Sequence, residues 1–212
     1  SDRTRRIELT SYAEVVLAAQ AQDESHPAFS NLFVQTEIVR PRRAIFCTRR
    51  PRSAEENPPW MIHMMSATGQ EIGEASYETD RMKFIGRSRS LASPAAFDER
   101  SPLSNTEGAT LDPVISIRHT LLLKPNEPVR IDIVTGMAET RDQVAAMAEK
   151  YSDASLADRV FELAWSRAPI LLRQLNATEA DAQIYGRLAG SVIYPSLLRR
   201  AKASVLIRNR RG

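Results

Sequence analysis

The chain has 212 residues, of which 42% are hydrophobic and 26% are charged, and its formal net charge is +3. These values are ordinary for a folded globular protein, and the length allows one large domain or one domain with an appendage. The basic residues are spread along the sequence, which excludes the profile of a dedicated nucleic-acid-binding protein. The single cysteine, Cys47, excludes an internal disulfide and a cysteine-rich metal site.

The two ends of the sequence indicate a piece of a larger protein. Residues 1–6 are polar and show no signal-peptide pattern, and residues 208–212 come directly after an apolar run. No apolar stretch approaches the roughly 20 residues that span a bilayer. We therefore expect a soluble fragment whose ends were cut.

The first two thirds of the sequence predict β-strands. Short runs of alternating or β-branched residues indicate strands at 6–10, 12–17, 32–38, 43–48, 60–65, 114–123 and 129–136. The last two runs flank the turn Pro125-Asn126-Glu127-Pro128, which predicts a hairpin with one solvent-exposed face. Polar or proline-containing segments predict loops at 20–30 and 49–59, and a largely irregular segment at 77–113.

The pattern becomes helical after Gly136. Helices are predicted at about 140–151, 155–175 and 178–194, with Thr140 as an N-cap and Pro169 as a kink or an end of the second helix. Trp165 and Tyr185 lie on the apolar stripes and are expected in the core. Strands followed by helices predict an α+β protein with a large antiparallel sandwich.

Residues 77–90 are the most chemically distinctive segment. They contain two carboxylates, Glu78 and Asp80, and four cationic side chains. Such a segment can bind a hydroxyl-rich ligand or an anion, and a salt-bridged connecting loop is an equal alternative. A glycosidase carboxylate pair is disfavoured because residues two apart on a strand share a face and do not flank a bond. We expect both carboxylates to pair with neighbouring arginines.

The remaining candidate sites favour structural roles. His26, His63 and His119 are dispersed, so packed or surface histidines are favoured over metal ligands. The sequence has no phosphate-binding glycine loop and predicts no cofactor. The basic run at 49–52 could face phosphate, although a solvated loop is the favoured interpretation. Cys47 is expected to be a small buried hydrophobe. For Trp60, a role in the core is favoured over stacking on a sugar ring.

Several blocks together resemble a known family. Tyr77-Glu78-Thr79-Asp80-Arg81, followed by Phe84-Ile85-Gly86-Arg87, is similar to a block of the inverting glycoside phosphorylases related to cellobiose phosphorylase. The similarity is strongest to the C-terminal region of the NdvB-type cyclic β-1,2-glucan synthases. Further blocks agree in order along nearly the whole chain, at 8–17, 26–37, 111–113, 161–165 and 208–212.

The resemblance implies an architecture. Residues 1–137 would form part of an antiparallel β-super-sandwich of the galactose mutarotase-like kind, and residues 138–212 a helical linker to an (α/α)₆ barrel outside this sequence. In the family, the aspartate general acid and most residues that bind the inorganic phosphate lie in that barrel. The resemblance therefore implies no catalytic residue, metal or cofactor in this chain, and no activity of the chain alone.

The resemblance also implies a function. The chain would be a non-catalytic carbohydrate-facing domain of a larger protein associated with the cytoplasmic side of an inner membrane. Its expected partners are a β-glucan or sugar acceptor and the barrel of the parent chain, with phosphate acting only in the parent. Arg81 would contact sugar, supported by Glu78, Asp80 and Arg87. One alternative is a structural or homodimerisation module without sugar contact, and a weaker one is an autonomous sugar-binding module.

Overall fold

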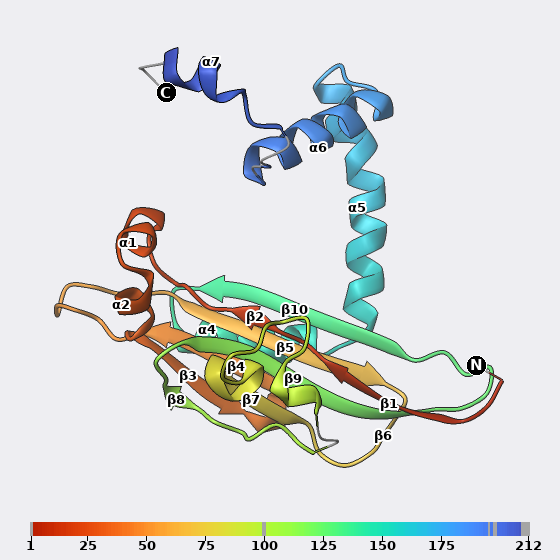
Figure 1. The fold of residues 1–212 in the computed structure, drawn as a ribbon. Helices are drawn as coiled ribbons and strands as arrows, with labels where there is room; N and C mark the ends of the chain where they lie inside the picture. Colours follow the sequence, from red (N-terminus) through yellow and green to blue (C-terminus); the bar gives the residue numbers. More distant parts are fainter. Residues whose placement is uncertain (1, 99–100, 195, 197–198, 209–212) are drawn as a thin grey trace. The chain divides into compact units, whose positions relative to one another are not determined.

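The computed structural model describes residues 2–98, 101–194, 196 and 199–208 (Figure 1). The chain divides into two compact units, Ser1–Ala157 and Asp158–Gly212. Among the described residues, every strand lies in the first unit, and the second unit contains helices. Residues 209–212, part of the C-terminal block noted above, lie outside the described residues.

Strand β9 (Pro113–Leu123) is the centre of the first sheet. It is paired on both edges, since Leu121 is opposite Ile7 on one side and Glu71 on the other. All of its neighbours are antiparallel to it. They are β1 (Arg5–Thr10) and β2 (Ala13–Glu14) on one edge, and β6 (Gln70–Glu71) and β7 (Ser76–Asp80) on the other.

The second sheet is antiparallel and follows the order β10-β5-β4-β3-β8. Its strands are β3 (Val34–Val39), β4 (Ala44–Arg49), β5 (Trp60–Thr68), β8 (Gly108–Ala109) and β10 (Arg130–Ala138). The short helix η1 (Arg40–Arg42) joins β3 to β4. The strands predicted at 6–10, 32–38, 43–48 and 60–65 are confirmed, whereas the strand predicted at 12–17 shortens to β2.

The hairpin predicted from residues 114–136 is wrong. Strands β9 and β10 both form, but β9 lies in the first sheet and β10 pairs with β5 in the second. Both edges of β9 are already occupied, so the turn at Pro125-Asn126-Glu127-Pro128 carries the chain from one sheet to the other. Sequence alternation indicates a strand but does not identify its partner.

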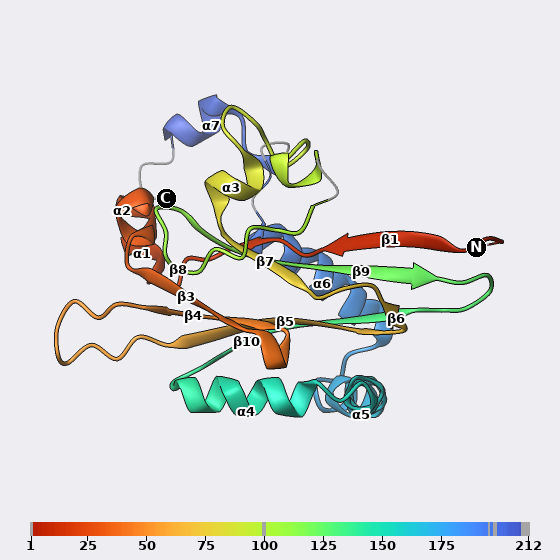
Figure 2. The same ribbon diagram turned by 90° about the horizontal axis from the view of Figure 1, so that it is seen from below.

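Strand β4 is apolar on both faces because both faces are covered. Ile45 and Cys47 pack in the core between the sheets, together with Met65, Tyr77 and others. Alternate residues such as Phe46 point to the opposite face, which is covered by helix α4 (Arg141–Tyr151) (Figure 2). Cys47 is fully buried, which confirms the expectation of a small buried hydrophobe, and burial raises the pKa of its thiol to about 12.

Helix α4 is an integral part of the sandwich unit. Val144 and Ala148 are fully buried against the second sheet. Thr140 caps the helix in a capping box with Gln143, as predicted. The compact unit therefore includes α4 and extends to Ala157, whereas the resemblance implied a sandwich over residues 1–137.

The outer face of the first sheet carries a smaller cluster. Phe84 and Ile85 of helix α3 (Arg81–Ile85) pack with Leu103 and Val114. Helix η2 (Ala95–Phe97) lies beside α3, and Arg118 fixes the nearby loop by donating to the carbonyls of Ala96 and Ser101. The sandwich therefore has covering elements on the outer faces of both sheets (Figure 2).

The polar loop predicted at 20–30 is partly helical. Helix α1 (Gln20–Ser25) and helix α2 (Pro27–Asn31) occupy this segment. Pro27 is favourable at the first position of α2, where a missing backbone N–H breaks no helical hydrogen bond. Helices this short give no apolar period, so the sequence pattern indicated a loop.

The second unit confirms the helices but not their expected burial. Helix α5 (Ser155–Gln174) continues through Pro169, and α6 (Glu179–Ile193) and α7 (Ala203–Arg208) follow. Trp165 is 85% exposed and Tyr185 is 58% exposed, so the prediction that they are core residues is wrong. A periodic stripe identifies an apolar helix face but does not show that the face is covered.

His63 is a buried polar residue of the sandwich. It is 4% exposed, and its two ring nitrogens form hydrogen bonds with Thr135 and Ser11, each at 2.9 Å. Burial lowers the pKa of His63 to about 4. Burial also lowers the pKa of His119, which lies beside Glu71. Both histidines are packed side chains, as expected.

His63 should make the fold sensitive to mild acid. The unfolded chain protonates this residue near pH 6.5, whereas the folded chain does so near pH 4, so stability falls as the pH drops between these values. We expect a loss of about 2 kcal/mol in unfolding free energy between pH 7 and pH 5, measured by urea unfolding. His63→Gln should flatten this dependence, and His26→Gln at an exposed position should not. A slope as steep in His63→Gln as in the wild type would contradict this assignment.

Candidate functional site

Residues 77–90 are more regular than the sequence predicted. Strand β7 ends at Asp80, and α3 begins at Arg81. The Asp80 side chain caps α3 by accepting a hydrogen bond of 2.9 Å from the backbone N–H of Met82. Gly86 ends the helix at φ +87°, a conformation that favours glycine, and a Cβ there would lie 2.8 Å from that of Ala95. The prediction of an irregular segment is therefore wrong for residues 77–85.

Glu78 supports the backbone from the interior. It is 2% exposed, and its Oε1 accepts hydrogen bonds from the backbone N–H groups of Thr79 and Asp80, both at 3.0 Å. Ser104 donates its hydroxyl hydrogen to Oε2. The pairing of β7 with β9 is irregular at this point, so the carboxylate satisfies N–H groups at a bulge. Neither Glu78 nor Asp80 forms the predicted pair with a neighbouring arginine in the described structure.

Arg81 lies at the surface in a network of polar side chains. Its Nε donates to Glu14 Oε1 at 3.1 Å, and its Nη1 is 3.6 Å from Asp112 Oδ2. Tyr12 also donates to Glu14, and Asn31 donates to Asp112. Three segments far from Arg81 in the sequence, at residues 12–14, 31 and 112, thus surround one guanidinium. About two fifths of the Arg81 side chain remains exposed.

The neighbouring carboxylates stabilise the positive charge of the Arg81 guanidinium. The hydrogen bond from Arg81 to Glu14 raises the pKa of Arg81. Burial, followed by the bond to Glu14, raises the pKa of Tyr12 to about 12, so its phenol remains protonated and donates. The Tyr12 ring also packs 4.7 Å from the Phe84 ring. We name Tyr12, Glu14, Arg81 and Asp112 the Arg81 surface.

Arg87, the last residue of the predicted set, is exposed beyond α3. The described structure gives it no ion pair with the Arg81 surface. The predicted set therefore separates into a surface donor, Arg81, a buried support, Glu78, a helix cap, Asp80, and an exposed arginine, Arg87.

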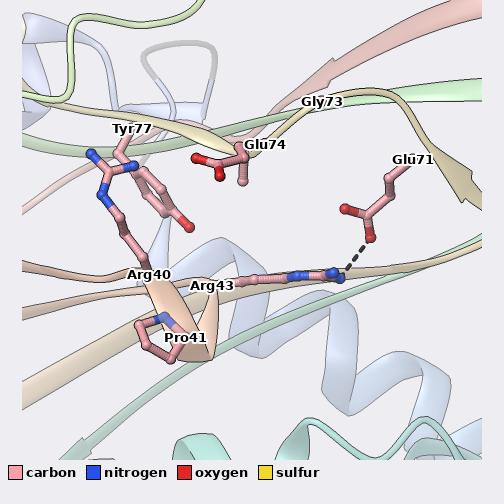
Figure 3. Close-up of a pocket in the computed structure, with 8 residues that line it drawn as sticks. Arg40, Pro41, Arg43, Glu71, Gly73, Glu74 and Tyr77 are labelled. Carbon is pink, nitrogen blue, oxygen red and sulfur yellow. Dashed lines mark hydrogen bonds and ion pairs between the residues drawn. The ribbon is translucent and has the colours of Figure 1, made fainter.

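A second polar site lies beside the turn that joins β6 to β7. It is a hollow of about 370 Å³ (Figure 3). Arg40, Glu74 and Tyr77 are grouped at one end of it, and Arg43 reaches toward Glu71 at the other (Figure 3). We name it the Arg40 hollow, and its lining residues are Arg40, Pro41, Arg43, Glu71, Gly73, Glu74, Ala75 and Tyr77. The sequence analysis missed it because its residues come from two distant segments.

Two contacts organise the Arg40 hollow. The guanidinium carbon of Arg40 lies 5.6 Å from the centroid of the Tyr77 ring, a cation–π arrangement. Arg43 donates to Glu71 at 2.6 Å, and the other Glu71 oxygen lies 3.4 Å from His119 Nδ1. Burial raises the pKa of Tyr77, so its hydroxyl stays protonated at neutral pH.

The basic run at 49–52 is not a solvated loop throughout. Arg49 is 6% exposed and donates to the backbone carbonyls of Val16 and Ser30. Arg52 lies over the Phe33 ring, 4.8 Å from its centroid. Carbonyl groups and an aromatic ring therefore satisfy these guanidiniums. This corrects the expectation for Arg49 and weakens a phosphate-binding role for the run.

Comparison with known proteins identifies the family. Residues 1–154 match the model of the glycosyl hydrolase 94 supersandwich domain. The chain belongs to this family. Over 202 residues it is 34% identical to the protein "Cyclic beta-(1,2)-glucan synthase NdvB" of Rhizobium meliloti (strain 1021). The alignment covers 95% of this chain and 7% of that relative, so the chain spans a small part of the relative's length.

These matches confirm the resemblance and the α+β super-sandwich class. The chain contains a supersandwich domain related to part of a glucan synthase. Within the described residues, no helix has the length and apolar character needed to cross a membrane. The expected place at the cytoplasmic side of an inner membrane stays a prediction.

Substitutions of Glu78 test how much its hydrogen bonds stabilise the end of β7, from which Arg81 follows. Glu78→Ala should lower the free energy of unfolding by about 3 kcal/mol, because it leaves one buried and one partly buried backbone N–H group without an acceptor. Glu78→Gln keeps an acceptor oxygen and should cost less than about 1 kcal/mol. Urea unfolding measures both. Equal losses in the two variants would show that the carboxylate charge, not hydrogen-bond acceptance, matters.

Proposed function

We propose that this chain is a non-catalytic, carbohydrate-facing domain of an enzyme that builds or phosphorolyses β-glucans. The family match and the glucan synthase relative support the class of enzyme. In this proposal the bond-breaking groups lie in another part of the parent protein, and inorganic phosphate acts only there. The contribution of this domain is to hold sugar units of the acceptor in position.

The geometry of Arg81 carries the proposal. A guanidinium has five N–H donors in a rigid fork, and the ion pairs with Glu14 and Asp112 fix the fork at the surface. Because the side chain is already ordered, it loses less conformational entropy when a ligand binds. The carboxylates of Glu14 and Asp112 can also accept hydrogen bonds from sugar hydroxyls. The surface therefore suits a neutral polyhydroxyl chain.

The geometry does not support a catalytic role for Glu78 and Asp80. Glu78 is buried and bonded to backbone groups, and Asp80 caps α3. A glycosidase pair requires two carboxyl groups on opposite sides of the scissile bond, about 5 to 9.5 Å apart across an open cleft. These side chains are instead committed to the fold.

A structural or dimerisation module is the second candidate. The exposed apolar residues of α5 favour it, with Phe161 72% exposed and Trp165 85% exposed. Soluble proteins rarely leave large apolar patches uncovered. In this case the barrel of the parent chain or a second copy would cover the helices, and the Arg81 surface would be scaffold only.

Sugar binding at Arg81 separates the two candidates. In a titration of the chain with β-1,2-linked gluco-oligosaccharides, we expect shifts of the backbone amide NMR signals of residues 80–85, with a Kd of about 1 mM. Arg81→Met should weaken this response at least tenfold because it removes the donors and keeps the aliphatic stem. Arg89→Met, at an arginine paired with Asp98, is the matched control and should bind normally.

The structural alternative predicts a different outcome. The amide signals of residues 80–85 would then respond alike in the wild type, Arg81→Met and Arg89→Met. That result would remove the sugar-contact role of Arg81.

A further inference from the structure

The Arg40 hollow has balanced charge. Arg40 and Arg43 contribute two guanidiniums, and Glu71 and Glu74 contribute two carboxylates. Arg43 and Glu71 form an ion pair with each other at 2.6 Å. This balance disfavours an anion, which the carboxylates would repel, and a cation, which the guanidiniums would repel. An apolar ligand would cover these charged groups without giving them hydrogen bonds, which is costly.

The other end of the hollow holds polar groups that face a common space. Arg40 lies over the Tyr77 ring and Glu74 lies near the ring, while the Tyr77 hydroxyl is at the end of the ring away from the Arg40 guanidinium (Figure 3). Among the described residues, the structure gives no hydrogen bond between any two of Arg40, Glu74 and Tyr77. Arg40 and Glu74 therefore offer a donor fork and an acceptor carboxylate to a ligand, while the buried Tyr77 supplies the ring beneath Arg40.

This combination matches the chemistry of a sugar. Each sugar hydroxyl donates one hydrogen bond and accepts others, so a vicinal pair can donate to Glu74 while it accepts from Arg40. Bonds to charged partners are roughly twice as strong as neutral ones. The volume of about 370 Å³ falls in the range of about 300–1,000 Å³ found for small-molecule sites.

The walls of the hollow are held in place by the sandwich. Tyr77 is 1% exposed on β7, and Glu71 on β6 contacts both Arg43 and the buried His119. Both strands pair with β9, so their spacing is set by the sheet. Gly73 has a φ of +74°, and a Cβ there would meet nothing within 4 Å, so the turn leaves open space.

We propose that the Arg40 hollow is a second sugar-binding site, selective for a neutral glucose unit and separate from the Arg81 surface. The two sites share no residue and are linked by β7. The choice of a β-1,2-linked glucan as ligand rests on the function proposed above. The site would bind a glucan segment away from the Arg81 surface, so the domain would contact more sugar units of the same glucan.

The test is a site-resolved titration of this chain with glucose and with the β-1,2-linked glucose disaccharide. We expect the amide NMR signals of Gly73 and Ala75 to shift saturably, with the disaccharide binding at least as tightly as glucose. Arg40→Met and Glu74→Gln should each weaken the response at least tenfold. Arg42→Met is the matched control in the same turn, because Arg42 pairs with Glu149 and does not line the hollow.

Two further arms identify the ligand class and the independence of the site. Arg81→Met should leave the shifts of Gly73 and Ala75 unchanged, and inorganic phosphate should not produce them. Normal binding in both Arg40→Met and Glu74→Gln would overturn the proposal, as would shifts caused by phosphate and not by sugar. If the Arg81→Met variant lost the Gly73 response, the two regions would form one continuous site. If that variant lost only the response of residues 80–85, the result would support two separate sites.

Discussion

Pairing of β9 on both edges is the constraint on which the rest of the sandwich depends. Ile117 is opposite Tyr77, Val114 is opposite Glu14, and Pro113 is opposite Asp80. A slip of one residue would turn every side chain of a strand to the other face. The same pairing places the end of β7 and strand β2 on either side of the start of β9. Arg81 and Glu14 meet because of that register, although 67 positions separate them.

Each polar site takes part of its residues from strands that pair with β9, and the Arg40 hollow takes the rest from the turn between β3 and β4. The Arg81 surface begins where β7 ends, and the Arg40 hollow begins where β6 and β7 are joined. Buried polar groups keep these strands in place: Glu78 satisfies the bulge in β7, and His63 links Ser11 near β2 to Thr135 on β10. The domain thus holds hydrogen-bonding groups in fixed positions at its surface, and such preorganisation lowers the cost of binding the proposed ligand.

Much of the fold follows from local sequence patterns. The alternation in β10 and the capping threonine Thr140 of α4 predicted these elements correctly, because local hydrogen bonding and a covered face determine them. The partner of β10 could not be predicted, since it depends on which edges of β9 are already occupied. The burial of Arg49 was also missed, because its acceptors are carbonyls from segments that pass nearby only in the folded chain.

The candidate site could also be predicted only in part, because its side chains meet only in the folded chain. The motif at 77–87 identified Arg81, but charge density alone could not show that Glu78 points inward to backbone N–H groups. The Arg40 hollow had no sequence signal, because Arg40, Arg43 and Glu74 are ordinary loop residues until the two turns meet.

Both proposed sites require that the sandwich itself binds neutral sugar. A crystal structure of this chain with the β-1,2-linked glucose disaccharide would show this binding. We expect sugar hydroxyls within about 3.2 Å of Arg40 and Glu74, or of the Arg81 guanidinium. Sugar found only against the helices α5 and α6, or no sugar on the sandwich at a saturating concentration, would contradict it.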